Sequence, residues 1–188
     1  MILTDQSILD YRAQWHIVIE PFYPECLWSN SYDAHLSKHI AYYIDDVIDT
    51  RRENILVYVE IPEEGMILYP NRLYLWSTIE YTETYLHVPY IEWKSSTGRA
   101  GISIHATAGK WDIGFQWHRT LEISVTHPVR VYHSMPIAQF IYHSVEGICN
   151  RPYHSKSHAK YHNQGHKPIG THMHKNYNHD PLRRDSVS

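Results

Sequence analysis

Short runs of apolar and β-branched residues, separated by turn residues, dominate the first 150 positions of the chain. Such runs cover residues 17–19, 54–61, 66–69 and 73–81, and Pro-Glu-Glu-Gly at 62–65 is a turn by composition. Further runs at 102–104, 120–125, 129–132 and 137–142 follow one another at intervals of about ten residues. Many short strands with little helix are typical of a β-sandwich or β-barrel.

One short helix is predicted before the first strand. Thr4 can act as the N-cap of a helix that runs to about Arg12, because its hydroxyl can accept a hydrogen bond from a free N–H of the first turn. The β-branched run 17–19 then favours a strand that ends at Glu20-Pro21.

The apolar pattern stops after Gly147. Residues 151–188 are rich in His, Lys, Asn and Ser, which is typical of a polar tail that orders only in part or on binding. We therefore expect one domain over residues 1–150 and a His-rich, partly flexible lid or tail over 151–188. On a helix, His154, His158, His162 and His166 would align and could bind a transition metal, but incidental histidines in a polar tail are the favoured interpretation.

The bulk composition excludes several classes of protein. The chain has 188 residues, 43 % of them hydrophobic and 20 % charged, as in a soluble single domain. No apolar run approaches the roughly 20 residues of a membrane span, and nothing at the N-terminus resembles a secretion signal, so a cytoplasmic protein is expected. A formal net charge of −3 argues against nucleic-acid binding. Cys26 and Cys149 are expected to be reduced and buried.

Polar and charged side chains concentrate between residues 93 and 122. Residues 93–99 read Trp-Lys-Ser-Ser-Thr-Gly-Arg, residues 105–115 read His-Ala-Thr-Ala-Gly-Lys-Trp-Asp-Ile-Gly-Phe, and residues 120–122 read Thr-Leu-Glu. Cations and hydroxyls of this kind can hold a nucleoside triphosphate, while a carboxyl group stays free for acid–base chemistry. The pattern resembles the dCTP deaminase branch of the dUTPase superfamily.

Other segments extend this resemblance. Residues 1–5, 18–22 and 31–36 look like opening motifs of the family, 135–140 like its late strand, and Tyr153 with 159–164 like its C-terminal lid. The resemblance implies a mainly β, dUTPase-like fold, a β-barrel or β-clip with short helices. It also implies a homotrimer with active sites between subunits, and Mg²⁺ bound through the triphosphate of the substrate.

The implied reaction is hydrolytic deamination of dCTP to dUTP and ammonia, a step of pyrimidine deoxynucleotide biosynthesis. Glu122 matches the catalytic glutamate of the family and would move a proton from the attacking water to N3 of cytosine. By analogy, the Ser95 hydroxyl and the Ala108 carbonyl orient that water. Arg99 would place a fixed charge beside them. Taken alone, the strand pattern Thr120, Glu122, Ser124 favours a solvent-facing carboxylate.

The expected substrate contacts lie in the same motifs. Asp112 would accept the 3′-hydroxyl of the sugar, and Phe115 would pack on the deoxyribose where a ribose 2′-hydroxyl would collide. The phosphates would meet Lys94, Ser96 and Gln139, with Lys160 and Gln164 covering the γ-phosphate. The remaining expected contacts are His105, Thr107, Trp111 and Tyr153.

The sequence departs from the family at positions that are usually glycine, where it has Ser37, Trp93, Trp117 and Ser134. Glycine often serves backbone geometry or close approach. The two tryptophans therefore suggest an altered pocket wall or interface, and leave open whether the base is plain or 5-substituted cytosine.

Zinc chemistry is excluded, because the chain lacks the His/Cys-x-Glu and Pro-Cys-x-x-Cys motifs of the zinc deaminases. Two alternatives stay open. A bifunctional enzyme would also cleave dUTP to dUMP and pyrophosphate, with Asp112 activating water; Gly109 favours it, since family members with glycine there often look bifunctional. A catalytically silent nucleotide sensor would bind a partner through the His-rich tail, but a sensor has no reason to keep Ser95, Arg99 and Glu122 together.

Overall fold

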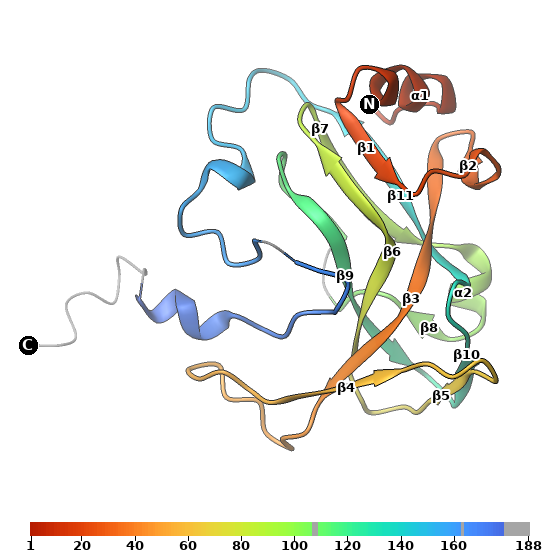
Figure 1. Cartoon of the computed structure of the whole chain (residues 1–188), viewed down its shortest axis with the longest axis vertical. Coiled ribbons are helices and arrows are strands. Elements are labelled where there is room, and N and C mark those ends of the chain that lie inside the picture. The colour runs from red at the N-terminus through yellow and green to blue at the C-terminus, as the bar shows by residue number, and fades with distance from the viewer. Residues whose placement is uncertain (107–108, 163, 179–188) are drawn as a thin grey trace, which may run out of the picture.

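The computed structural model describes residues 1–106, 109–162 and 164–178, and the chain opens with helix α1 (Asp5–Ala13) (Figure 1). The Thr4 side chain accepts a hydrogen bond from the N–H of Ser7, so the predicted N-cap is confirmed. Strand β1 (Ile17–Glu20) follows, also as predicted. Ile8, Ile17 and Ile19 are fully buried and anchor both elements to the core.

The rest of the chain is mainly β. In order, the elements are η1 (Pro24–Cys26), β2 (Leu27–Trp28), β3 (Ser31–Tyr43), β4 (Leu56–Glu60), β5 (Met66–Leu68), β6 (Tyr74–Thr84), β7 (His87–Trp93), α2 (Ser95–Arg99), β8 (Ile102–Ser103), β9 (Gln116–Val125), β10 (Val129–Val131), β11 (Pro136–Ser144), η2 (Tyr153–Ser155) and η3 (Met173–Asn178).

One large antiparallel sheet organises these strands. Its order is β7-β11-β3-β6-β9-β8, with β1 paired to β6 and both β2 and β4 paired to β3, while β5 and β10 form a separate pair. Tyr32, Leu36, Trp76 and Phe140 are among the buried side chains of its core. The mainly β, barrel-like architecture expected from the sequence is confirmed.

Strands β3 and β7 and helix α2 were not predicted from the apolar pattern. β3 carries Asp33 and His35, and most of its residues on both faces are buried, so no apolar–polar alternation marks it. β7 contains Pro89, which cannot donate to a neighbouring strand, and β7 accordingly lies at one end of the sheet order.

The C-terminal segment, residues 153–178, packs against the sheet. Thr120 donates its hydroxyl to Oε1 of Gln164 (3.1 Å), and the Thr171 N–H donates to the Tyr43 hydroxyl (2.7 Å). The described residues between 156 and 172 contain no helix, so the four evenly spaced histidines do not align on one. Figure 1 shows this blue segment on the opposite side of the sheet from α2.

The surface adds three observations. Cys26 and Cys149 are both free, as predicted, but neither is buried: Cys26 is partly exposed, and Cys149 is exposed in the connection after β11. Within the described ranges, no helix has the length and apolar character needed to span a bilayer.

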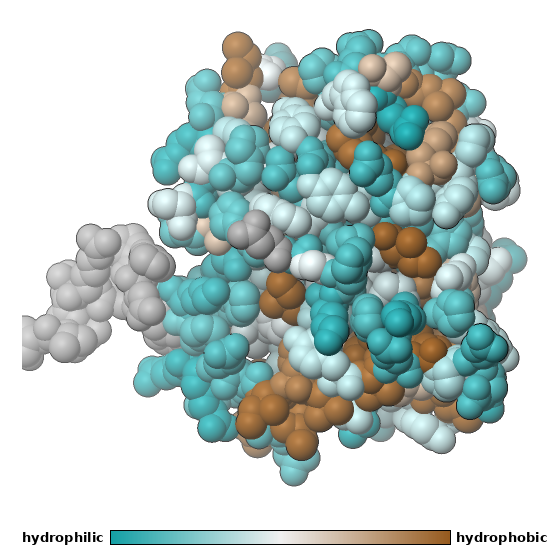
Figure 2. Space-filling view, in the orientation of Figure 1, coloured by the Kyte–Doolittle hydropathy of each residue, from teal (hydrophilic) through white to brown (hydrophobic). Residues whose placement is uncertain are grey.

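The β3–β4 connection exposes Ile44, Val47 and Ile55, and Figure 2 shows hydrophobic side chains gathered at that lower edge.

Candidate active site

A cavity of about 420 Å³ lies between β9, the 104–115 stretch and the C-terminal segment. A volume of this order suits a small-molecule ligand. Seven of the predicted catalytic and substrate-binding residues line it, and we call them the cavity group: His105, Trp111, Asp112, Phe115, Glu122, Tyr153 and Gln164.

Glu122 is half-buried on β9 between the buried residues Leu121 and Ile123. Strand alternation therefore turns Glu122 and Thr120 toward the cavity. Its Oε2 accepts a hydrogen bond from the Ala106 N–H (3.1 Å), which fixes one oxygen of the carboxyl group. Glu122 therefore lines the cavity with its carboxyl group fixed by a hydrogen bond, and it is not a solvent-facing strand residue.

Asp112 sits between two lysines. Its carboxylate lies 3.1 Å from Lys110 Nζ and 3.6 Å from Lys156 Nζ. Burial alone would raise the pKa of Asp112, but the two lysines outweigh it and hold that pKa below its ordinary value. Asp112 is therefore an ionised hydrogen-bond acceptor at neutral pH.

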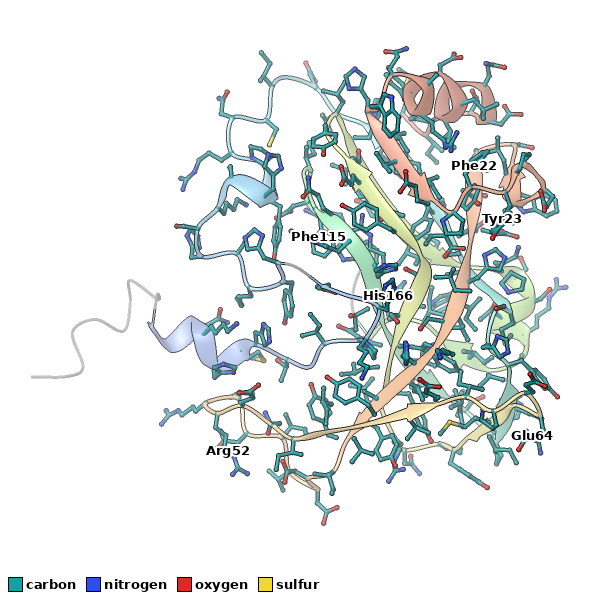
Figure 3. All side chains as sticks on the ribbon, viewed as in Figure 1. Phe22, Tyr23, Arg52, Glu64, Phe115 and His166 are labelled. Carbon is teal, nitrogen blue, oxygen red and sulfur yellow. The ribbon has the colours of Figure 1, made fainter. Side chains whose placement is uncertain are left out.

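Aromatic rings form one wall of the cavity. Phe115 is 4 % exposed, and its ring centroid lies 5.1 Å from Tyr153 and 6.4 Å from Trp111. Figure 3 labels Phe115 beside β9, on the side of the sheet that the C-terminal segment covers. The wall is therefore built from the residues that precede β9 and from the C-terminal segment together.

A second set of predicted residues lies elsewhere. We call it the α2 group: Lys94, Ser95, Ser96, Arg99 and Gln139, none of which lines the cavity. Ser95, Ser96 and Arg99 are exposed on α2, which lies across the sheet from the C-terminal segment (Figure 1). The structure thus separates the predicted site residues into two groups.

Local contacts hold the remaining members of the α2 group. Lys94 is ion-paired with Asp33, and its Nζ lies 5.4 Å from the Trp28 ring centroid. Gln139 accepts a hydrogen bond from the Ser31 hydroxyl (3.0 Å) and donates one to the Trp93 carbonyl (3.2 Å). These bonds fix Lys94 and Gln139 beside the exposed hydroxyls of α2.

Three predicted site residues belong to neither group. Thr107 and Ala108 lie outside the described residues. Lys160 does not line the cavity, and its backbone carbonyl accepts a hydrogen bond from His172 Nδ1 (2.8 Å) within the C-terminal segment.

Two of the four departures from glycine, Trp117 and Ser134, have an unusual backbone conformation. Trp117 (φ 97°) and Ser134 (φ 60°) adopt left-handed conformations that glycine reaches without strain. Trp117 packs edge-on against Phe115 (6.0 Å) and His162 (5.6 Å). Trp93 is 44 % exposed and stacks on His105 (5.6 Å). Neither tryptophan lines the cavity. Each packs against a residue that does, Trp117 against Phe115 and Trp93 against His105.

Several cavity residues escaped the sequence interpretation. Thr120 could have been found from the sequence, because it shares a strand face with Glu122. Lys110 could have been found as well, because it lies inside the polar stretch 93–122. Tyr161 stands inside the lid motif 159–164, whereas Tyr43 gave no local signal because it reaches the cavity only through the fold.

Comparison with known proteins gives a consistent result. The dCTP deaminase-like family model matches residues 2–145. A Leptospira biflexa serovar Patoc protein named dCTP deaminase, dUMP-forming, is 44 % identical over 168 residues, 89 % of this chain and 94 % of that protein. A Clostridium acetobutylicum protein of the same name is 42 % identical over 163 residues, 87 % of this chain and 91 % of that protein.

A solved structure shares the fold. The crystal structure of 2′-deoxycytidine 5′-triphosphate deaminase from Agrobacterium tumefaciens superposes with a TM-score of 0.61 at 20 % identity. The match covers 80 % of this chain and 50 % of that longer chain.

Proposed function

The chain belongs to the dCTP deaminase-like family, and we propose on that basis that it hydrolyses dCTP at C4 and releases ammonia. The observation that carries this proposal is the position of Glu122, a half-buried carboxyl group held at the wall of a nucleotide-sized cavity. A silent sensor would not require an acid–base group at that position.

We propose that Glu122 moves the protons of the reaction. As a carboxylate it takes a proton from water while the water oxygen attacks C4, and it passes that proton to N3. A second transfer to the amino nitrogen lets the C4–N bond break and ammonia leave. Ser95 and the Ala108 carbonyl would orient the water, and Arg99 would stabilise the developing negative charge.

We propose dUMP and pyrophosphate as the further products, through attack of a second water on the α-phosphate of dUTP. The names of the relatives support this choice over dUTP alone. Gly109 supports it as well, since it lines the cavity at the position that the family resemblance links to bifunctional members. A Cβ there would meet the Ile91 carbonyl oxygen far inside contact distance, so the backbone admits only glycine.

The separation of the two residue groups supports active sites shared between copies. If Glu122, Ser95 and Arg99 act on one substrate, we propose that one copy supplies the cavity group and another the α2 group, because no member of the α2 group lines the cavity of a single chain and α2 lies across the sheet from the C-terminal segment. Contacts that join different surfaces of identical copies form a ring when the rotation between copies closes. We propose the homotrimer implied by the family, with exposed apolar residues such as Val47 available for contact.

We propose that Mg²⁺ arrives with the triphosphate. The donor set around the cavity fits this, because Asp112 is paired with lysines and Glu122 is hydrogen-bonded, so the described residues offer no carboxylate cage. When bound, the ion neutralises phosphate charge. Lys94 and the hydroxyls of Ser95 and Ser96 would contact the phosphate oxygens.

The test is product analysis. The protein is incubated with Mg²⁺ and dCTP, dCMP or 5-methyl-dCTP, and nucleotides, ammonia and pyrophosphate are measured. We expect ammonia, dUMP and pyrophosphate in equal amounts from dCTP, without inhibition by a zinc-selective chelator. Accumulation of dUTP without pyrophosphate would refute the dUMP product, and no ammonia from any cytosine nucleotide would refute deamination.

A further inference from the structure

Arg119 is a fully buried cation beneath the aromatic wall of the cavity. Its side chain is 1 % exposed, and its Nε donates to the Thr82 hydroxyl (2.8 Å). Among the described residues, no carboxylate lies within ion-pairing distance of it, and one terminal nitrogen has no hydrogen-bond partner. An arginine without a carboxylate is an unfavourable group to bury, so its environment must compensate in another way.

Two aromatic rings supply that compensation. The guanidinium carbon lies 4.4 Å from the Phe115 ring centroid and 5.0 Å from the Trp111 ring centroid. Burial lowers the pKa of Arg119 to about 9, so the group is still charged at neutral pH. A cation over ring faces is attracted by the ring quadrupole, more strongly where water is excluded.

The backbone of β9 directs Arg119 to this position. Thr120 and Glu122 face the cavity, so Arg119 points to the other face of the strand. The pairing of β6 with β9 shifts register between Ser77 and Tyr81, and within this irregularity the Arg119 N–H donates to the Thr78 hydroxyl (2.9 Å). Arg119 is therefore held by both its backbone and its side chain.

The two rings flank the segment that carries Asp112. Residues 111–115 form no regular helix or strand, and the Phe115 N–H donates to the Asp112 carbonyl (3.1 Å). Trp111 stands at one end of this segment and Phe115 at the other, and both rings rest on the same guanidinium. Arg119 thus joins both ends of the segment from beneath.

We propose that Arg119 is a positioning residue for sugar discrimination, holding Phe115 and Trp111 where the cavity admits 2′-deoxyribose and rejects ribose. The inference rests on the proposed function, because Phe115 and Asp112 are the sugar contacts of that proposal. Arg119 itself touches no substrate. It acts through the two rings.

The first test compares dCTP with CTP. Arg119→Met keeps an apolar side chain of similar length and removes the cation. We expect the ratio of kcat/KM for dCTP over CTP to fall by about tenfold, with kcat for dCTP changing less than the ratio. Thr82→Val, which removes only the Nε partner, should shift the ratio in the same direction by less, and it replaces Arg119→Met if that variant does not fold. An unchanged ratio in the folded variants would overturn the proposal.

A double-mutant cycle separates positioning from general destabilisation. In a Phe115→Leu/Trp111→Leu background the rings are gone, so adding Arg119→Met should leave the ratio within about twofold, because coupled residues are not additive. A further tenfold loss would overturn the proposal. The control is Arg130→Met: Arg130 is exposed and bonds the Glu64 carbonyl, so its loss should leave the ratio unchanged.

Equilibrium binding keeps this result independent of catalysis. The dissociation constants of dCTP and CTP are measured by calorimetry for the same variants. A protein that binds dCTP more tightly than CTP, loses this preference with Arg119→Met and releases no ammonia would refute the proposed reaction and support the role of Arg119. Ammonia release from dCTP, together with an unchanged preference for dCTP over CTP in Arg119→Met, would support the proposed reaction and refute the role of Arg119.

Discussion

Most residues of the cavity group and of the α2 group come from the stretch 93–122, but the two groups occupy different environments. Phe115 and Gln164 are 4 % and 5 % exposed, and the cavity group rests on β9 and the C-terminal segment. Ser95, Ser96 and Arg99 stand exposed on a five-residue helix at the other side of the sheet. Residues that are close in sequence thus lie in different environments of the fold.

Glu122→Gln should separate the chemical role of the cavity group from its binding role. Removing the proton carrier without changing its size is expected to lower kcat by about 1,000-fold, while the dissociation constant of dCTP changes little. Ammonia release and calorimetry provide the two measurements. The exposed Glu60→Gln serves as the control and should keep full activity. Deamination within threefold of the unmodified rate would contradict the assigned role.

Arg99→Met tests whether the α2 group matters although it lies away from the cavity. Loss of a fixed charge beside the reacting atoms is expected to lower kcat/KM by about 100-fold. The matched substitution is Arg51→Met on the β3–β4 connection, where no loss is expected. If Arg99→Met retained full activity, the α2 group would have no part in the site.

Gly109→Ala and Gly98→Ala compare the backbones of the two groups. A Cβ at Gly109 would collide with the Ile91 carbonyl, which should lower the free energy of unfolding by about 1–3 kcal/mol. At Gly98 in α2 the nearest side-chain atom is 3.9 Å away, so alanine should raise that free energy by up to about 1 kcal/mol. Thermal denaturation checks both variants, and equal effects would show that the contrast in packing is mistaken.

The pH dependence of stability should also differ between the two sides. Beside the cavity, burial and then nearby His166 lower the pKa of His118 below 6.5. The unfolded chain then binds the proton more readily, so stability falls as the pH drops below 6.5. Figure 3 shows His166 beside the sheet, and the two imidazole centroids are 4.6 Å apart.

On the α2 side of the sheet, the pH dependence of stability has the opposite sign. A hydrogen bond to Glu80 raises the pKa of His35 against the opposing effect of burial. Its stabilising contribution is complete below 6.5 and is lost as the pH rises through the raised value. His118→Gln should therefore reduce the acid-side loss, and His35→Gln the alkaline-side loss, in unfolding measured from pH 5 to 8. Identical pH profiles for both variants would disprove this assignment.

The sequence predicted part of this arrangement. Regular β-branched runs predicted most strands, and the cap at Thr4 predicted α1, because both patterns are local. β3 was missed, since its polar residues are satisfied across the sheet, as His35 is by Glu80. The cavity residue Tyr43 and the buried Arg119 were missed because their roles depend on contacts with residues far along the chain.

Mixing two inactive variants tests most directly whether the groups meet between copies. Glu122→Gln and Arg99→Met chains carrying different tags are co-expressed, and the mixed assemblies are isolated. In a mixed homotrimer one of the three interfaces joins an intact cavity group to an intact α2 group, so the isolated mixed assemblies should show about a third of the unmodified deaminase activity. Activity no higher than the mean of the two separate variants would contradict a site shared between copies.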